Sequence, residues 1–259
     1  MPRQSILIEA CVSSAADAAA AVEAGAHRIE LCAALEVGGL TPSIGLIQRV
    51  SAAVSVPVMV MIRPRVGDFT PSDDEFVTML ADIAAAKRAG AAGVVFGLLT
   101  PNGEVDAPRT KLVVDAAEGL QTVFNRAIDF TPNPVAAATK LADLSVTRVL
   151  TSGGATTALE GAATIRQMAK QTADHLEILP GGGVRAANIA SILEATGCRQ
   201  LHLGPGIAEQ GPILLNGPAL TDTTTLSSGA HRKLDAAAFD KAIRTASSLA
   251  PDSNPKPTR

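Results

Sequence analysis

The sequence predicts an α/β fold, a (β/α)8 TIM barrel, as a single domain over residues 1–250. Eight short runs rich in apolar and β-branched residues alternate with eight runs that are rich in alanine or carry helix start and stop signals. No linker-like segment divides the chain. A doubly wound open sheet is the alternative, but it usually has five or six strands and, for dinucleotides, a glycine fingerprint after the first strand. Here the first predicted strand is followed by Cys-Val-Ser-Ser-Ala, without glycine.

The predicted strands are the apolar and β-branched runs. They cover residues 5–12, 28–32, 57–62, 93–99, 121–129, 148–152, 176–179 and 200–203. Residues 204–234 contain no such pattern and are expected to be irregular. Residues 251–259 are polar and rich in proline, which predicts a disordered tail.

The predicted helices are bounded by capping residues and glycines. Ser13 or Ser14 suits the N-cap of the first helix, and Gly25 its end. The run that begins Ser72-Asp-Asp-Glu places acidic groups at the N-terminus of the third helix, and Gly90 closes it. The predicted helices cover residues 13–24, 43–53, 72–89, 108–118, 134–143, 155–172, 188–196 and 235–249.

The composition argues against nucleic acid and membrane partners. Only 18% of the residues are charged, the net charge is −3, and Trp and Tyr are absent. The chain therefore lacks the basic stripes and aromatic platforms that bind nucleic acids. No apolar run approaches about 20 residues, so no membrane span is predicted. The N-terminus does not resemble a signal peptide, which favours a cytoplasmic location.

Cysteine usage agrees with a reducing compartment. The three cysteines are Cys11, Cys32 and Cys198, with no Cys-x-x-Cys spacing. An odd and sparse set of this kind fits the cytosol better than a disulfide framework.

In a (β/α)8 barrel the active site lies at the carboxyl ends of the strands. Polar residues gather at these ends in this chain, which packing alone does not explain. Because side chains alternate along a strand, Glu30 and Cys32 share one face. The residues at or just after the predicted strand ends are Glu9, Cys11, Glu30, Cys32, Arg63, Arg65, Asn125, Arg126, Asp129, Thr151, Ser152 and His202.

These strand ends resemble those of the CutC family, which is described as a family of copper homeostasis proteins. The similar segments occur in order over roughly residues 5–206. They are RIELC (28–32), GGLTPS (38–43), IRPRVGDF (62–69), RVLTSG (148–153) and PGGGVR (180–185). The resemblance implies a cytosolic (β/α)8 barrel that is usually a homo-oligomer and handles Cu(I) or supports copper tolerance. It implies no established enzymatic activity.

Two segments depart from the family pattern. Where the family typically has FHRAFD, residues 124–129 are FNRAID, so that Asn125 replaces a histidine. Where many members have HSSA or HCSA, residues 202–205 are HLGP. The first change replaces a titratable imidazole, which can bind metal, with a neutral amide.

Cys11 and Cys32 are the candidate ligands of a copper(I) ion. Cu(I) prefers soft thiolate and thioether ligands. The two thiols lie at the ends of neighbouring strands, which are about 4.8 Å apart, so they can converge on one ion. The alternative is that both are small buried hydrophobic residues. Met59 and Met61 share a strand face, but core packing explains them more easily.

Glu9, Glu30, Asp129 and His202 are the candidate acid–base residues. Carboxylates and an imidazole at one barrel mouth suit proton abstraction or isomerisation of a small polar or anionic, sugar-like metabolite. A network of ion pairs that holds the strand ends in register is the alternative for the carboxylates. His202 is a candidate general base, metal ligand or satisfied core residue.

Arginines near these acids are the candidate binding groups for such a substrate. Arg63 and Arg65 flank one proline and could form a planar clamp for carboxylate or phosphate. Arg126 and the neighbouring Asn125 would add to it.

Hydroxyl and backbone groups complete the predicted binding site. Thr151 and Ser152 offer hydroxyl donors. Gly182 and Gly183 follow the seventh strand, where barrels often bind phosphate through backbone N–H groups. No organic cofactor is predicted.

Two classes of function therefore remain open. One is a Cu(I)-binding protein, and the other is an enzyme that acts on a small anionic metabolite. The charged groups outnumber the soft ligands, which favours the enzyme, whereas the family resemblance favours copper. Geometry discriminates between them: sulfur atoms of Cys11 and Cys32 about 4 Å apart with an open approach would favour copper.

Overall fold

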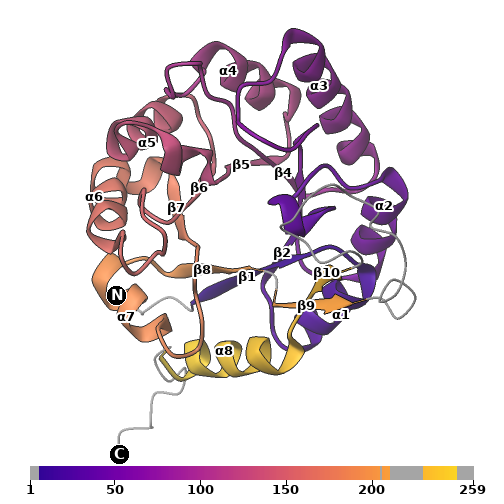
Figure 1. Cartoon of the computed structure of the whole chain (residues 1–259), viewed down its shortest axis with the longest axis vertical. Helices are drawn as coiled ribbons and strands as arrows, with labels where there is room; N and C mark the ends of the chain where they lie inside the picture. The colour runs from indigo at the N-terminus through magenta and orange to yellow at the C-terminus, as the bar shows by residue number, and fades with distance from the viewer. Residues whose placement is uncertain (1–5, 205, 211–229, 250–259) are drawn as a thin grey trace, which may run out of the picture.

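The computed structural model describes residues 6–204, 206–210 and 230–249. Eight parallel strands form a nearly closed barrel with helices around its outside, which confirms the predicted (β/α)8 architecture (Figure 1). Their hydrogen-bonded order is β7-β6-β5-β4-β3-β2-β1-β8. The strands are β1 Leu7–Val12, β2 Arg28–Leu31, β3 Val58–Met61, β4 Gly93–Phe96, β5 Gln121–Phe124, β6 Arg148–Thr151, β7 Glu177–Pro180 and β8 Gln200–Leu203.

Most of the described helices begin after a residue whose side chain caps the backbone. Ser14 accepts a hydrogen bond from the backbone N–H of Asp17, and Ser72 and Glu75 form a reciprocal capping box. None of the described helices is both long and apolar enough to cross a bilayer. The helices are α1 Ala15–Glu23, α2 Ile44–Ala53, α3 Asp73–Arg88, α4 Ala107–Ala116, α5 Pro134–Asp143, α6 Ala162–Thr172, α7 Ile189–Thr196 and α8 Ala236–Leu249.

Alternation along the strands creates two separate apolar regions. Outward-facing residues such as Ile8, Ile29 and Val60 are buried against the helices in one large core. A second, small cluster fills part of the barrel interior. Its buried members are Cys11, Cys32, Met59, Met61, Val95 and Val123.

Polar side chains close the amino-terminal end of the barrel. Arg148 donates from Nε to Glu177 Oε2 at 2.7 Å and from both Nη atoms to Gln121 Oε1 at 3.1 Å. Gln200 Nε2 donates to Glu177 Oε2 and to the carbonyl of Ile178, each at 3.3 Å. The last bond joins β8 to β7, the two strands at the ends of the hydrogen-bonded order. These bonds connect β5, β6, β7 and β8 at this end of the barrel.

The fifth strand is shorter than predicted. It ends at Phe124 rather than at residue 129, and Arg126–Phe130 form the 3-10 helix η2. The cause is Asn125, whose Oδ1 accepts from the backbone N–H of Ala127 at 2.9 Å. A side chain that caps the backbone in this way favours a turn over a continued strand.

The sixth helix begins at Ala162, although the predicted helix began at residue 155. A Cβ on Gly161 would lie 1.9 Å from the carbonyl oxygen of Ser152, so the chain passes too closely there for a side chain. The N–H of Ala158 donates to Gly182 O at 2.9 Å. Residues 155–161 are thus held as a loop between the ends of β6 and β7.

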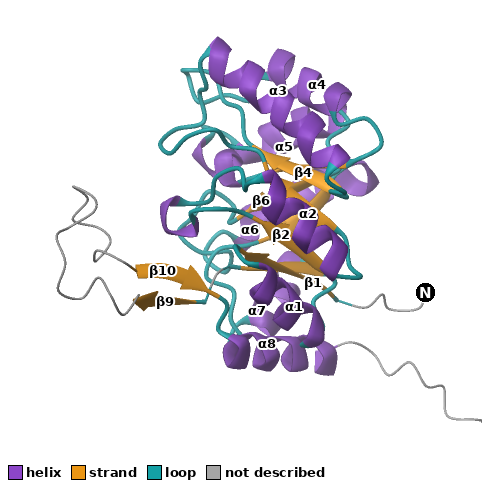
Figure 2. Cartoon of the chain, turned by 90° about the vertical axis from the view of Figure 1, so that its right-hand side faces the viewer, coloured by secondary structure: helices purple, strands orange, loops and turns teal. Residues whose placement is uncertain are grey.

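The stretch predicted to be irregular, residues 204–234, contains a hairpin. Its strands β9 (Ile207–Gln210) and β10 (Ala230–Lys233) pair in antiparallel register. Figure 2 shows the hairpin projecting from the barrel on the side where the loops gather. Ser13, just after β1, donates to the carbonyl of Arg232 at 3.4 Å. The predicted tail at 251–259 lies outside the described residues.

Candidate metal and acid–base site

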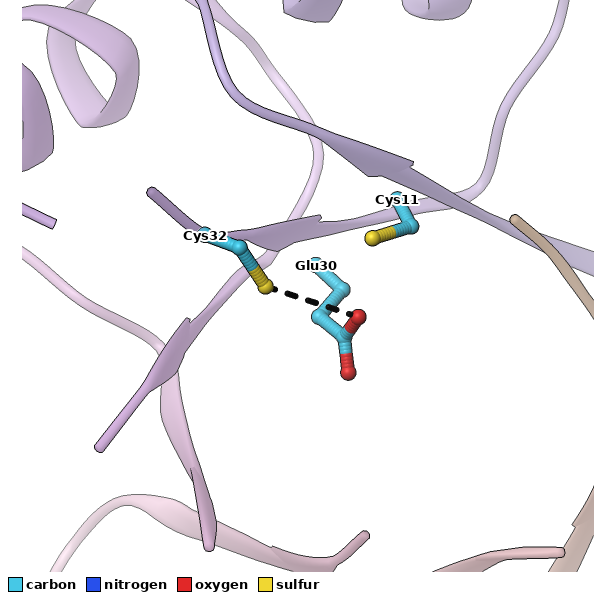
Figure 3. Close-up of side chains that lie close together, drawn as sticks. All are labelled: Cys11, Glu30 and Cys32. Carbon is cyan, nitrogen blue, oxygen red and sulfur yellow. Dashed lines mark hydrogen bonds between the residues drawn. The ribbon is translucent and has the colours of Figure 1, made fainter. Parts of the chain in front are cut away.

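Strands β1 and β2 bring two thiols and a carboxylate together inside the barrel. Cys11 pairs in register with Glu30, and Cys32 follows Glu30 by two residues on the same face of the chain. Figure 3 shows the three side chains pointing toward the same space. The Cys32 thiol donates to Glu30 Oε2 at 3.7 Å. The ligand atoms of all three residues lie within 4.8 Å of one another, and all three side chains are buried.

Both thiols are protonated at neutral pH. The hydrogen bond with Cys32 and burial raise the pKa of Cys11 well above its ordinary value. The same contact lowers the pKa of Cys32, but burial and the charge of Glu30 outweigh it and leave that pKa raised. The thiols therefore require a cation to hold them as thiolates.

Behind the thiols, Glu9 binds two cationic groups. Its Oε1 lies 2.7 Å from His202 Nδ1, and its Oε2 accepts from Arg28 Nε. Burial alone would raise the pKa of Glu9, but the hydrogen bond with His202 and the charges of Arg28 and His202 lower it to about 2. Burial lowers the pKa of His202, yet Glu30 and Glu9 raise it well above its usual range. Glu9 and His202 thus form a buried carboxylate–imidazolium pair.

Glu30 occupies a different environment from Glu9. Burial and the negative charge of Glu9 raise the pKa of Glu30, and the imidazolium of His202 opposes this shift. His202 Nε2 is 3.9 Å from Glu30 Oε2. Glu30 Oε1 is fully buried and has no hydrogen-bond partner within the described residues. An unpartnered buried oxygen is costly, which suggests that a ligand satisfies it.

Among the described residues, two sets of ligand atoms are compact enough to hold a metal ion. One comprises Cys11, Glu30 and Cys32, and the other comprises Glu9, Glu30 and His202. In the second set, Glu9 already binds His202 and Arg28, so an ion would have to break those bonds. The first set is the better fit for a metal, and its two sulfur atoms select a soft one.

A cavity of about 320 Å³ lies above this cluster, at the carboxyl end of the barrel. A volume of this size suits a small metabolite. The floor carries the thiols, Glu30 and His202, while two arginines and a glycine loop lie among the other lining residues. The lining comprises Cys11, Glu30, Cys32, Leu35, Gly38, Met61, Phe69, Asn125, Arg126, Leu150, Gly182, Gly183, Val184, Arg185, His202 and Gly204.

The structure gathers eight of the predicted site residues around the cavity. They are Cys11, Glu30, Cys32, Asn125, Arg126, Gly182, Gly183 and His202. Glu9 supports His202 from behind and does not line the cavity. Asn125, which stands at the family's histidine position, lies with its Nδ2 4.0 Å from the sulfur of Met61. Its amide thus faces the cavity while its oxygen caps η2.

Asp129 is buried beneath the loop after β6, away from the cavity lining. Its Oδ1 accepts from Thr151 Oγ1 at 2.5 Å and from Gly154 N at 3.1 Å. Its Oδ2 accepts from Ser152 N at 3.0 Å and from Arg126 Nε at 2.8 Å. Thr151 and Ser152 are themselves buried. These three residues fix the loop and orient Arg126, which is the role of an ion-pair and hydrogen-bond network.

Arg63 and Arg65 do not line the cavity. Arg63 donates to the carbonyls of Val37, Gly39 and Gly67. Arg65 pairs with Asp68 and Glu75 and donates to the carbonyl of Thr70. Their guanidinium groups instead hold the loops after β2 and β3 in place.

Two residues at the cavity were not predicted from the sequence as site residues: Arg185 was not considered, and Met61 was assigned to the core. Both line the cavity. The signal for Arg185 was present, because it is the last residue of the PGGGVR segment. It lies five residues beyond β7, and only the fold of the glycine loop brings it back to the mouth.

A model of the CutC family matches residues 6–207 of the chain, which covers every strand of the barrel. The chain belongs to the CutC family. A CutC family protein of Glaesserella parasuis is 44% identical over 195 residues, which cover 75% of this chain and 80% of that protein. The human copper homeostasis protein cutC homolog is 44% identical over 196 residues, which cover 76% of this chain and 72% of that protein.

A solved structure of the CutC family agrees with this assignment. The crystal structure of a copper homeostasis protein CutC from Streptococcus agalactiae superimposes with a TM-score of 0.73 at 34% sequence identity. The match covers 77% of this chain and 98% of that structure. Both the fold and the family expected from the strand ends are therefore confirmed.

Proposed function

We propose that this CutC family protein serves copper homeostasis by binding one Cu(I) ion through Cys11 and Cys32. The observation that carries the proposal is the convergence of the two sulfur atoms and Glu30 within 4.8 Å, at the floor of an open cavity. The human relative that bears a copper homeostasis name supports it.

The chemistry of the donor set fits Cu(I) better than a harder ion. Two thiolates are the preferred soft ligands, and Glu30 supplies an additional negative charge. Met61 offers a thioether nearby. Gly39 lies against both side chains, because a Cβ built on it would be 3.1 Å from Cys32 Sγ and 3.7 Å from Met61 Cε. The raised pKa values of both thiols mean that copper must displace protons, so binding should strengthen as pH rises.

An anaerobic Cu(I) titration against a competing chelator tests this proposal. We expect wild type to bind one equivalent, and Cys11→Ser and Cys32→Ser each to weaken binding by at least about 100-fold, because each removes half of the thiolate pair. Cys198→Ser is the matched control, since Cys198 is also a free, buried cysteine but lies outside the cavity lining. Wild-type affinity in both Cys11→Ser and Cys32→Ser would contradict the thiol site.

A second candidate is acid–base catalysis on a small polar metabolite. Support comes from Glu30, which lines the cavity beside the Glu9–His202 pair and has one oxygen without a hydrogen-bond partner among the described residues. In this function Glu30 takes a proton from a carbon next to a carbonyl group, and the electron pair moves to the carbonyl oxygen. Exchange of such protons in heavy water, followed by NMR over a set of sugars and keto acids, tests it. Exchange that disappears in Glu30→Gln would support the enzyme, and no exchange with any compound would count against it.

We also propose that the protein acts in the cytoplasm as a homo-oligomer. Three free cysteines within the described residues fit a reducing compartment. Light scattering of the purified protein should give a multiple of the 26.4 kDa chain mass. A monomer mass at micromolar concentration would contradict the oligomer.

A further inference from the structure

The loop after β7 lines the cavity and has backbone N–H groups without an acceptor among the described residues. Gly182 and Gly183 have φ angles of +98° and +69°, values that favour glycine. The backbone N–H groups of Gly182, Gly183 and Val184 donate no hydrogen bond to any described residue, whereas Gly181 donates to the carbonyl of Thr151. Successive N–H groups in such a loop form a concave binding site for anions.

The loop is held in this conformation from outside the cavity. Asn188 Nδ2 donates to Gly183 O at 2.9 Å, and Asn188 Oδ1 accepts from Arg185 N at 2.8 Å. The carbonyl of Gly182 accepts from Ala158 N at 2.9 Å. The carbonyl groups of Gly182 and Gly183 are thus hydrogen-bonded, whereas the N–H groups of the loop remain free to bind a ligand.

Arg126 lies directly against this loop. Its Nε donates to Asp129 and its Nη2 donates to Ser152, so the guanidinium is fixed in place. Its Nη1 has no hydrogen-bond partner in the described part of the chain. A Cβ on Gly182 would lie 3.4 Å from this Nη1, which is ordinary van der Waals contact, so the guanidinium packs against the loop.

Arg185 adds a second positive charge to the same rim. It is exposed and lines the cavity, and its guanidinium makes no ion pair or hydrogen bond with a described residue. Asp129 balances the charge of Arg126, whereas Arg185 has no such counterion in the described structure. Two guanidinium groups and three free N–H groups therefore surround one region of the mouth, which is more than a single carboxylate requires.

The floor opposite this rim offers an acceptor. Glu30 lines the cavity at 3% exposure, and its Oε1 has no hydrogen-bond partner among the described residues. We propose that the mouth binds the phosphate group of a small hydroxylated phosphate monoester through Arg126, Arg185 and the Gly182–Val184 N–H groups, with a hydroxyl of the ligand directed to Glu30. The phosphate-binding groups are separate from the two cysteines, although Glu30 belongs to both sites, and the inference goes beyond the proposed copper function.

Calorimetric titration of the full-length protein, without copper, tests the phosphate site. The probes are inorganic phosphate, glycerol 3-phosphate and malonate, the last being a dianion without phosphorus. We expect saturable binding of inorganic phosphate, weakened at least tenfold in Arg185→Gln and unchanged in Arg166→Gln, an exposed arginine of α6 that is remote from the cavity lining. Arg185 is exposed, so its removal is not expected to disturb folding.

Each of these titrations has a result that would contradict part of the proposal. Absence of saturable phosphate binding in wild type, or equal binding in Arg185→Gln, would overturn the anion site. Tighter binding of malonate than of phosphate would overturn the phosphate assignment in favour of a carboxylate. We expect glycerol 3-phosphate to bind more tightly than inorganic phosphate, and this gain to be lost in Glu30→Ala. Equal affinity for the two phosphates would overturn the contact with Glu30.

Discussion

At the scale of single residues, two glutamates on adjacent strands show how environment decides protonation. Glu9 binds an arginine and a histidine, which lower its pKa to about 2. Glu30 lies beside thiols and a second carboxylate, and burial raises its pKa. Desolvation acts on both, so the difference comes from the partners. Glu9 therefore stays ionised, whereas Glu30 is the residue that can exchange a proton or bind a ligand.

The lowered pKa of Glu9 predicts a specific loss of stability in acid. Its ordinary value is 4.5, so between that pH and about 2 the unfolded chain binds more protons at this site than the folded chain does. The stabilisation is present above pH 4.5 and is lost as pH falls, by about 3 kcal/mol at 1.36 kcal/mol per pKa unit. Urea unfolding of wild type and Glu9→Gln at several pH values measures it.

The comparison isolates Glu9 from the other carboxylates of the chain. Glu9→Gln is expected to be less stable than wild type near neutral pH, because buried Arg28 loses the negative charge that it pairs with, and to lose less stability on acidification. Glu23→Gln, at an exposed position of α1, is the control. Equal acid slopes in wild type and Glu9→Gln would show that Glu9 does not carry this effect.

At the scale of elements, Asp129 connects η2 to the loop after β6. It accepts hydrogen bonds from Thr151, Ser152, Gly154 and Arg126, and so joins two consecutive βα loops. Hydrogen bonds to a charged acceptor are roughly twice as strong as those between neutral groups, because the negative charge attracts each donor more strongly. The loop that positions Arg126 depends on this carboxylate.

Asp129→Asn should therefore lower the free energy of unfolding by roughly 2–4 kcal/mol, since the amide keeps the shape but removes the charge and one acceptor oxygen. Denaturant unfolding at neutral pH measures the change. The control is Asp115→Asn, which breaks an exposed ion pair with Lys111 on α4 and should cost less than about 1 kcal/mol. Similar losses in the two variants would contradict a special role for Asp129 in the loops.

Element boundaries also show where the sequence was insufficient. The strand pattern of residues 121–129 continues past Phe124, but Asn125 turns the chain by capping its own backbone. The start of α6 depends on the close approach of Gly161 to Ser152, two residues that no local pattern relates. By contrast, Ser14 and Ser72 predicted helix starts correctly, because caps act within three residues.

At the scale of the whole molecule, the barrel was predictable and the site only in part. Strand–helix alternation fixes the fold, and period-two alternation places Cys11, Glu30 and Cys32 on the interior face. These periodic patterns do not predict how the loops between strands and helices fold. The loop after β3 turns Arg63 and Arg65 toward backbone carbonyls and acids, while the loop after β7 brings a later arginine to the mouth.

The same interior combines soft ligands on one side with cationic groups on another. The thiols and Met61 belong to the side formed by β1, β2 and β3, while Arg126 and the glycine loop follow β5 and β7. The barrel thus separates two binding chemistries within one cavity. The first of them is the proposed binding of one Cu(I) ion by the two cysteines.

X-ray absorption spectroscopy at the copper edge tests whether both cysteine sulfur atoms bind the ion. Wild-type protein loaded anaerobically with one equivalent of Cu(I) should show two or three sulfur atoms in the first coordination shell, from Cys11, Cys32 and Met61. Cys32→Ser, loaded in the same way, should lose one of them. A wild-type spectrum with only nitrogen and oxygen neighbours would contradict the thiol site and leave the cavity to a metabolite.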